Sequence, residues 1–394
     1  MTLKEFRFQR LKAAAEQAGA DLVVASLPAN VQYISGYFNI NTDVLQRTES
    51  YALFHPASGK VSIIGSIAEL PSVAESVGMD ADFYCYGSFR FAGVEGHPLT
   101  ELLEKTQASR NFGTLPAALA AAIKDSGAKR VALDENRCCV TTWNAVVAAC
   151  PDAEIFPGSA IFMQARLVKH EEEIAGVERA TEIADEALAT ALKGFKPGMT
   201  ELDLQHTYLV ELARHDAKPL FFVATAAKRA AYSDTKNTDL AIHEGDIIRF
   251  DYGCVWNGYN SDLARTAVVG KPDEKTAAYF EAVRRGTHDA IAAIKPGMTA
   301  EQVFETAMKV TRENGIPHYE RHHCGHGIGV ECYDRPSIAP GDTTPLEEGM
   351  VINVETPYYE LGWGGVQMEN TVVITKDGCR YLDKSGDALI VLEV

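Results

Sequence analysis

The sequence predicts two domains: an α/β domain at residues 1–155, and an α+β domain at residues 160–394 that contains an internal pseudo-two-fold repeat. Three observations lead to this prediction. Helix and strand patterns alternate through the first part of the chain. The segment PDAEIFPGSA (151–160), with two prolines and a glycine, then interrupts the pattern. Finally, one set of motifs occurs twice in the remainder. A chain of 394 residues is also longer than one ordinary core requires.

The first domain begins with charged and apolar residues at helical spacing, which predict an amphipathic helix over residues 4–19. DLVVAS (21–26) follows as a buried strand, and YALFHP and KVSIIG predict a hairpin around ASG. A helical pattern at 115–127 precedes another buried strand, RVALDE (130–135). This alternation is typical of an α/β domain. It contains no phosphate-binding loop and no convincing catalytic cluster.

The second domain repeats a unit of two helices and a hairpin. KPGMT occurs at 196–200 and again at 295–299, each time between two helical patterns. HEGDIIRFD (243–251) matches EEGMVINVE (347–355) at a similar offset, and SDLARTAVV resembles MENTVVI. A solenoid would need more copies than two. The repeat therefore predicts a pseudo-two-fold domain whose paired hairpins meet at its centre.

The charge balance limits the classes of partner. The chain has 37 basic and 54 acidic residues, a net charge of −17 that repels phosphate backbones and anionic membranes, so we expect neither nucleic acid nor membrane partners. Its eight cysteines form no CxxC pair and are expected to be reduced and mostly buried. The first twenty residues lack the apolar core of a signal peptide, and no later segment is apolar enough to span a bilayer. A cytoplasmic protein is expected.

The repeat places carboxylates at matching points. Asp251 and Glu355 end the first strands of the two hairpins, and Asp262 and Glu369 open the return strands. Each acid has apolar strand residues beside it, which argues against four surface positions. Four like charges in a partly buried site would repel one another strongly without cations. With one imidazole added, five ligands suit a two-metal centre with bridging carboxylates that activates a shared water.

The stretch ERHHCGHGIGVECYDRPSI (320–338) contains the best imidazole, His326, whose flanking glycines allow the backbone to approach a metal closely. A phosphate loop is disfavoured because neither GxGxxG nor GxxxxGK is present. Zinc binding by Cys324 and Cys332 is an alternative, although an oxygen-rich set selects harder metals than thiolates do. We expect His322 to contact ligands or substrate rather than metal, and the role of His323 stays open.

These motifs resemble the metallopeptidase family of methionine aminopeptidase, aminopeptidase P and prolidase (family M24). The catalytic half resembles aminopeptidase P and prolidase through FDYG…SDLARTAVV, GHGIG, GMVINVE and GGVQMENTVVIT. The N-terminal half resembles the creatinase-type domain through RLKAAAEQAGADLVVASLPANVQYISGY. The resemblance covers the whole chain and implies the pita-bread fold and a homodimer. It implies the metal ligands Asp251, Asp262, His326, Glu355 and Glu369.

The resemblance also implies roles within that set. Asp262 and Glu369 would bridge two divalent metals, and Glu355 would accept the proton of the bridging water as general base. Oxygen ligands with one imidazole favour manganese or iron. We therefore expect two manganese ions, with iron, cobalt and zinc as the alternatives.

The positions that would face substrate depart from the family's pattern. Tyr333 stands where many family peptidases have a histidine, Asp234 falls by ungapped count where they have another, and Gln367 replaces an arginine. The usual EPG after the third carboxylate ligand is ETP. With His322, these residues are the expected substrate contacts. The changes at 234 and 367 predict a more negative pocket and a substrate with a cationic amine or guanidinium.

Tyr333 is expected to donate its hydroxyl to the substrate oxyanion, a role that the family's histidine implies. The alternatives are that Tyr333 packs against Pro336 at the rim, and that Asp234 points away from the site.

Three functions follow. The first is a two-metal hydrolase of a peptide or amide C–N bond, of Xaa-Pro type, acting on a short peptide. The second is a family offshoot acting on a small non-peptide metabolite: an amidino or cyclic-amide hydrolase like creatinase or ectoine hydrolase, or a lyase. The third is a non-catalytic binding module. It ranks last because such a module is expected to lose the ligands and gain basic patches, whereas this chain keeps the ligands and is acidic.

Overall fold

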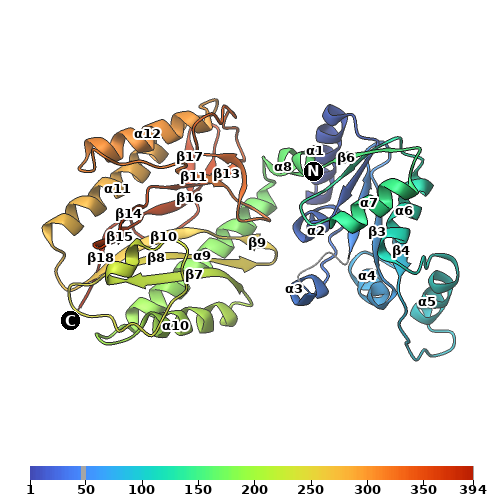
Figure 1. Cartoon of the computed structure of the whole chain (residues 1–394), viewed down its shortest axis with the longest axis horizontal. Coiled ribbons are helices and arrows are strands. Elements are labelled where there is room, and N and C mark those ends of the chain that lie inside the picture. Colours follow the sequence, from blue (N-terminus) through green and yellow to red (C-terminus); the bar gives the residue numbers. More distant parts are fainter. Residues whose placement is uncertain (46–49, 394) are drawn as a thin grey trace. The chain divides into compact units, whose positions relative to one another are not determined.

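The computed structural model describes residues 1–45 and 50–393, which form two compact units, Met1–Arg166 and Leu167–Val394 (Figure 1). The division falls later than the 155–160 expected from the prolines. The strand β6 (Glu154–Pro157) pairs in parallel with β5 (Arg130–Leu133) and still belongs to the first sheet. A proline is tolerated there because β6 is an edge strand. The next helix, α8 (Ser159–Arg166), packs against α1 (Leu3–Ala18), so it also belongs to the first unit.

The first unit is the predicted α/β domain. Its six-stranded sheet has the order β4-β3-β2-β1-β5-β6, with the predicted hairpin formed by β2 and β3. The strand β1 pairs in parallel with β5, as alternating strands and helices require. The remaining strands are β1 (Leu22–Ala25), β2 (Tyr51–His55), β3 (Lys60–Ser66) and β4 (Asp82–Tyr86). The helices are α2 (Pro28–Ser35), α3 (Asn41–Leu45), α4 (Leu70–Ser76), α5 (Pro98–Ser109), α6 (Leu115–Ser126) and α7 (Val140–Ala149), with the 3₁₀ turn η1 (Ile67–Glu69).

The second unit is the predicted repeat. Each copy begins with two helices: α9 (Glu171–Lys193) and α10 (Glu201–Arg214), then α11 (Glu274–Ala293) and α12 (Ala300–Glu313). The main path of the large sheet is β12-β11-β13-β16-β10-β8-β7. Its strands are β7 (Lys218–Ala226), β8 (Ile247–Trp256), β10 (Leu263–Val269), β11 (Gly325–Gly327), β12 (Asp334–Ser337), β13 (Val351–Glu355) and β16 (Glu369–Ile374). Smaller elements are η2 (Ala227–Ala231), β9 (Tyr259–Asn260), β14 (Tyr358–Glu360), β15 (Gly364–Val366), β17 (Cys379–Tyr381) and β18 (Ile390–Leu392).

The two copies share backbone hydrogen bonds as well as sequence. The amide of Gly198 donates to the carbonyl of Ile242, and that of Gly297 donates to Leu346, each at 2.8 Å. Both glycines have a positive φ, +89° and +86°, which explains a glycine in both copies of KPGMT. The helices of each copy bury apolar side chains against their own half of the sheet. The halves join where β10 pairs antiparallel with β16.

Residues 383–385 tie the copies together a second time. The carboxylate of Asp185, on α9, accepts hydrogen bonds from the Ser385 hydroxyl at 2.7 Å and from the Tyr252 hydroxyl at 2.8 Å. The buried guanidinium of Arg265, on β10, donates to the carboxylate of Asp383 at 3.0 Å. We call residues 383–385, with Asp185 and Arg265, the inter-copy tie. It connects the first copy to a segment that follows the second.

The cysteines and the helix lengths test two further expectations. All eight cysteines are free as predicted, but only four are buried, namely Cys85, Cys150, Cys254 and Cys324. Within the part of the chain that the structure describes, none of the helices has both the length and the apolar character that a bilayer crossing requires.

Candidate metal centre

Strand register brings the predicted ligands to neighbouring positions on the sheet. Asp251 on β8 lies opposite Ala264 of β10, Ala264 lies opposite Glu369 of β16, and Glu369 lies opposite Glu355 of β13. Asp262 directly precedes β10. Residues opposite each other in neighbouring antiparallel strands have Cβ atoms about 5 Å apart. The matching positions inferred from the repeat therefore converge where the two copies meet.

Three of the five ligand residues already have metal-like spacing. One ligand atom each from Asp262, His326 and Glu369 lies within 4.8 Å of the others, and His326 Nε2 lies 3.5 Å from Asp262 Oδ2. These three and Glu355 are buried, whereas Asp251 is half-buried. All five line one cavity of about 360 Å³. The structure thus brings the whole predicted ligand set together.

The electrostatics of the site show why it fits divalent cations. Burial raises the pKa of Asp251 to about 7, and the nearby charge of Asp262 adds to the increase. Burial, together with neighbouring carboxylates, also raises the pKa values of Glu355 and Glu369. Burial opposes protonation of His326, but the contact with Asp262 outweighs it and raises the pKa of this imidazole. Buried carboxylates that resist ionisation in one another's presence are stabilised by bound cations, and an oxygen-rich set with one imidazole suits such ions.

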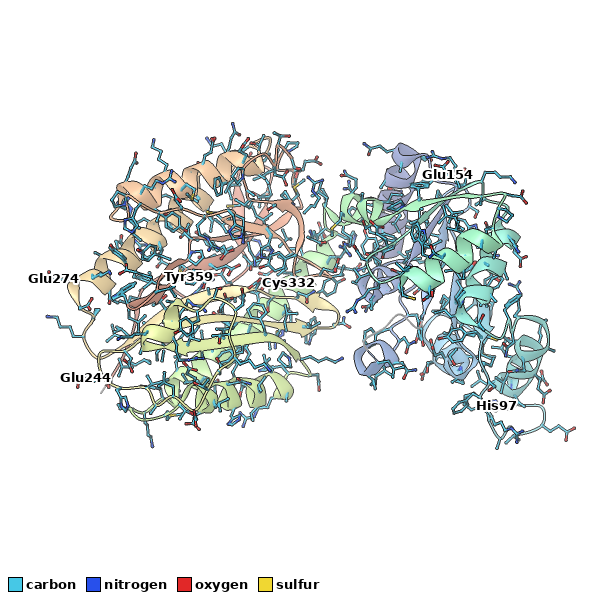
Figure 2. The ribbon with its side chains drawn as sticks, viewed as in Figure 1. His97, Glu154, Glu244, Glu274, Cys332 and Tyr359 are labelled. Carbon is cyan, nitrogen blue, oxygen red and sulfur yellow. The ribbon has the colours of Figure 1, made fainter. Side chains whose placement is uncertain are left out.

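Buried side chains that the sequence analysis missed orient the ligands. Asn353 donates from Nδ2 to Glu369 Oε1 at 3.0 Å and to the Asp262 carbonyl at 3.1 Å. The Thr371 hydroxyl donates to the same carbonyl at 3.1 Å. Both residues stand two positions from a ligand on a strand, so they point to the same face of the sheet as that ligand. This two-residue spacing is the sequence pattern from which both contacts could have been predicted. Cys332 Sγ also lies 3.1 Å from Asp262 Oδ2 (Figure 2).

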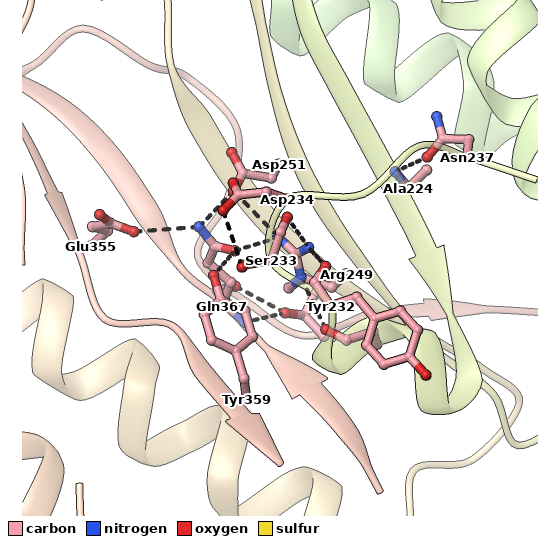
Figure 3. A network of polar contacts seen from close by, with 12 residues as sticks. Ala224, Tyr232, Ser233, Asp234, Asn237, Arg249, Asp251, Glu355, Tyr359 and Gln367 are labelled. Atoms are coloured by element: carbon pink, nitrogen blue, oxygen red, sulfur yellow. Dashed lines mark hydrogen bonds and ion pairs between the residues drawn. The ribbon is translucent and has the colours of Figure 1, made fainter. Parts of the chain in front are cut away.

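A second polar network surrounds Gln367 (Figure 3). Gln367 Nε2 donates to Asp251 Oδ2 at 3.1 Å and lies 3.5 Å from Glu355 Oε2. The buried Arg249 donates from its Nη1 atom to Gln367 Oε1 at 2.8 Å. A guanidinium from β8 therefore lies beside position 367, and a more negative pocket than in the family's peptidases stays a prediction. The sequence could have predicted this contact, because an arginine stands inside the apolar run IIRFD, two residues before the predicted ligand Asp251.

Two of the expected substrate contacts line the cavity. Tyr333 is 63% exposed, and its ring stacks on that of His326 with centroids 3.9 Å apart and planes at 27°. Asp234 is exposed and lines the same cavity, with the Ser233 hydroxyl 3.3 Å from its carboxylate. Tyr333 therefore packs on a predicted metal ligand, and Asp234 does not point away from the cavity.

The paired histidines differ in exposure and in their neighbours. His322 is exposed, and its ring meets His323 edge-on with centroids 4.5 Å apart. His323, whose role was left open, lies with Nδ1 3.3 Å from Glu355 Oε1. Burial, together with the charge of Arg321, lowers the pKa of His323 to about 4, so this imidazole is neutral near pH 7. A substrate contact by His322 stays a prediction.

Comparison with known proteins identifies the family. The model of metallopeptidase family M24 matches residues 175–376, and that of the creatinase/prolidase N-terminal domain matches residues 7–168. The chain belongs to metallopeptidase family M24. Both the predicted family and the predicted two-domain pita-bread architecture are confirmed.

Individual relatives agree with this assignment. An Xaa-Pro dipeptidase of Pyrococcus furiosus is 36% identical over 227 residues, which is 57% of this chain and 65% of that relative, less than two thirds of its length. An Xaa-Pro dipeptidase of Lactobacillus delbrueckii is 33% identical over 67% of this chain and 73% of its own. The solved prolidase of Pyrococcus horikoshii is 25% identical, with a TM-score of 0.80 over 98% of this chain and 99% of that one.

Proposed function

We propose that this protein is a metal-dependent hydrolase that cleaves the C–N bond of a short peptide, of the Xaa-Pro dipeptidase type. The observation that carries the proposal is the convergence of five ligand-type side chains, from both copies of the repeat, on one cavity. The relatives named Xaa-Pro dipeptidase support the choice of bond. We expect two divalent ions, with manganese first and iron, cobalt or zinc as the alternatives.

The chain's own side chains divide the work. Bound ions would supply Lewis acidity, lowering the pKa of the attacking water and polarising the scissile carbonyl. Asp251, Asp262, His326, Glu355 and Glu369 would hold the ions. Glu355 accepts the proton of the water and passes it towards the leaving nitrogen. His323 lies beside this carboxylate, with Nδ1 3.3 Å from Glu355 Oε1.

Substrate recognition falls to the walls of the cavity. Leu220, Phe221 and Val223, all from β7, form an apolar wall, and Asp234 provides a carboxylate that does not belong to the ligand set. A short peptide with a free amino group near Asp234 and an apolar first residue matches this lining. The Tyr333 hydroxyl is the expected donor to the substrate oxyanion.

A second candidate is hydrolysis of a small non-peptide amide or amidino compound. Asp234 and Tyr333 favour it, because both stand at cavity positions where the family's pattern has a histidine. A tyrosine is a poor proton donor to an amine leaving group near pH 7 compared with histidine.

Metal analysis and a substrate panel test the proposal together. The purified protein is loaded with manganese and assayed against Xaa-Pro dipeptides, matched dipeptides without proline, and cyclic-amide and amidino compounds. We expect metal-dependent cleavage of Xaa-Pro dipeptides, which Glu355→Gln reduces strongly while ions still bind. Turnover of the cyclic-amide or amidino compounds alone would replace the first candidate by the second. A protein that binds no divalent metal would overturn both.

We also expect a homodimer that acts in the cytoplasm. The family resemblance supports the dimer, and the eight free cysteines are consistent with a reducing compartment. Light scattering during size-exclusion chromatography gives the oligomeric state directly, and a monomeric mass at micromolar concentration would contradict the expectation.

A further inference from the structure

Arg249 makes more polar contacts than neutralising one carboxylate requires. Its side chain is fully buried on β8, and Nη1 donates to Gln367 Oε1 at 2.8 Å and to Asp251 Oδ2 at 3.3 Å. The rest of the guanidinium points to backbone. Nε donates to the Ala230 carbonyl at 3.0 Å, and Nη2 donates to the carbonyls of Tyr232 at 2.7 Å and Ser233 at 3.0 Å. All three of its nitrogen atoms are therefore used.

The three carbonyls belong to the segment that carries Asp234. Residues 230–233 comprise the end of η2 and the two residues after it, and they lie beside Arg249 (Figure 3). The next residue, Asp234, lines the cavity. The side chains of this segment are exposed at Tyr232, Ser233 and Asp234. Its backbone carbonyls at 232 and 233 accept hydrogen bonds from the buried Arg249. One guanidinium thus joins a predicted metal ligand to the segment that presents a substrate contact.

We propose that Arg249 is a positioning residue that couples the metal centre to the placement of Asp234, and thereby helps to select substrates with a free, cationic amino group. The selectivity part rests on the proposed function. The coupling part concerns only this chain and its metal site. Arg249 divides its hydrogen bonds between Asp251 and the segment 230–233, so a change at either end alters how firmly the other is held. Such coupling acts in both directions.

A purely electrostatic role for Arg249 makes a different prediction. If the side chain only balanced the charge of Asp251, lysine would replace it, since lysine keeps the charge. Lysine lacks the planar fork that reaches three carbonyls and an amide oxygen at once. Arg249→Lys therefore keeps the positive charge but removes most of the hydrogen bonds, which distinguishes an electrostatic role from a positioning role.

Arg229 offers a matched control from the same segment. Its Nη2 atom donates to the Lys236 carbonyl at 2.7 Å and its Nε atom to Glu201 at 3.1 Å. It thus holds the outer side of the loop through residues that are not in the metal site. Arg229→Lys removes none of the hydrogen bonds of Arg249, so it should lower manganese affinity far less than Arg249→Lys does.

The test compares wild-type protein, Arg249→Lys and Arg229→Lys in three assays. Hydrogen–deuterium exchange of residues 227–236 is followed with and without manganese, and manganese affinity is measured by calorimetry. The third assay compares KM for an Xaa-Pro dipeptide with KM for its N-acetyl derivative, at saturating manganese. The first two need no turnover, so they remain informative if the protein cleaves no peptide.

We expect manganese to slow exchange in residues 227–236 of the wild type. In Arg249→Lys, exchange should be faster and insensitive to manganese, and manganese affinity should fall ~10–100-fold, as for other residues that orient ligands. KM for the free dipeptide should rise ~10-fold, the cost of one charge-assisted hydrogen bond, while KM of the acetylated dipeptide stays the same.

Two results would overturn the inference. Unchanged exchange and manganese affinity in Arg249→Lys would reduce Arg249 to a counter-charge. If that variant does not fold, the wild-type protein provides the test. Hydrogen exchange in residues 227–236 that is the same with and without manganese would exclude the coupling. Equal KM increases for both dipeptides would remove the selectivity part alone.

Discussion

The two copies of the repeat share a backbone plan but face the cavity with different chemistry. In the first copy, β7 lies beside β8 and contributes an apolar wall that includes Val223, directly opposite Asp251. In the second, β11 lies beside β13 and contributes His326, on which Tyr333 stacks. The inner strands keep the carboxylates, whereas the outer strands have diverged. The cavity wall from the first copy is thus mainly apolar, whereas the wall from the second copy carries an imidazole and a phenol.

The same contrast appears two residues before the first ligand of each copy. Arg249 precedes Asp251, and Asn353 precedes Glu355. Both side chains are fully buried and both donate to a ligand carboxylate. Asn353 contacts only the centre of the sheet, through Glu369 and the Asp262 carbonyl, whereas Arg249 also reaches a loop. Arg249 therefore links Asp251 to the loop before Asp234, whereas Asn353 links Glu369 to the Asp262 backbone.

The largest expected effect comes from breaking the junction of the copies. Asp262→Ala or Glu369→Ala removes one of the two expected bridges, so metal content and turnover should fall together. The loss should exceed the ~100-fold typical of a residue that only orients a ligand. Metal analysis and steady-state rates on the same preparations test this. Full metal occupancy with full activity in either variant would exclude a two-metal centre.

The next effect tests the reactive wall of the second copy. Tyr333→Phe keeps the ring that stacks on His326 but removes the hydroxyl, so ions should stay bound while kcat falls by ~10²–10³, the usual cost of losing one oxyanion donor. Tyr333→His should restore activity only in part, because the shorter imidazole does not reach the same point. A wild-type kcat in Tyr333→Phe would assign this residue to packing alone.

A smaller effect sharpens the contrast between Arg249 and Asn353. Asn353→Ala removes hydrogen bonds to Glu369 and to the Asp262 carbonyl, so manganese affinity should fall ~10–100-fold. Because Asn353 does not contact the segment that carries Asp234, KM for free and acetylated dipeptides should keep the wild-type ratio. Calorimetry and kinetics at saturating manganese measure both quantities. A ratio that shifts as in Arg249→Lys would show that the two copies do not differ in this way.

The smallest effect concerns pH. Burial raises the pKa of Asp251 to about 7 in the metal-free protein, so this group binds more protons folded than unfolded between about pH 4 and 7. Metal-free stability should therefore fall as pH rises through that window. Metal binding needs the carboxylate form, so the gain in Tm on adding manganese should grow between pH 6 and pH 8, by a few degrees. Thermal melts with and without manganese check this, and an equal gain at both values would contradict it.

Motifs with strong local patterns could be predicted, but contacts between distant segments could not. The repeat located all four carboxylates, because strand alternation fixes which residues share a face. The domain boundary was misplaced because Pro157 resembles a linker residue, whereas an edge strand accommodates it. The proximity of His323 to Glu355 depends on how one loop turns, which spacing along the sequence does not encode. Arg249 was missed because its acceptors include backbone carbonyls 16 to 19 residues earlier.

The inter-copy tie has a consequence for synthesis of the chain on the ribosome. Asp185 and Ser385 are 200 residues apart in sequence, and Arg265 and Asp383 are 118 residues apart. At translation rates of ~5–20 residues per second, about 6–24 s therefore pass between the synthesis of Arg265 and that of its partner Asp383. During that interval the edge of β10 that later pairs with β16 is open to other strands. We expect the nascent first copy to depend on chaperones, and isolated halves of the unit to aggregate.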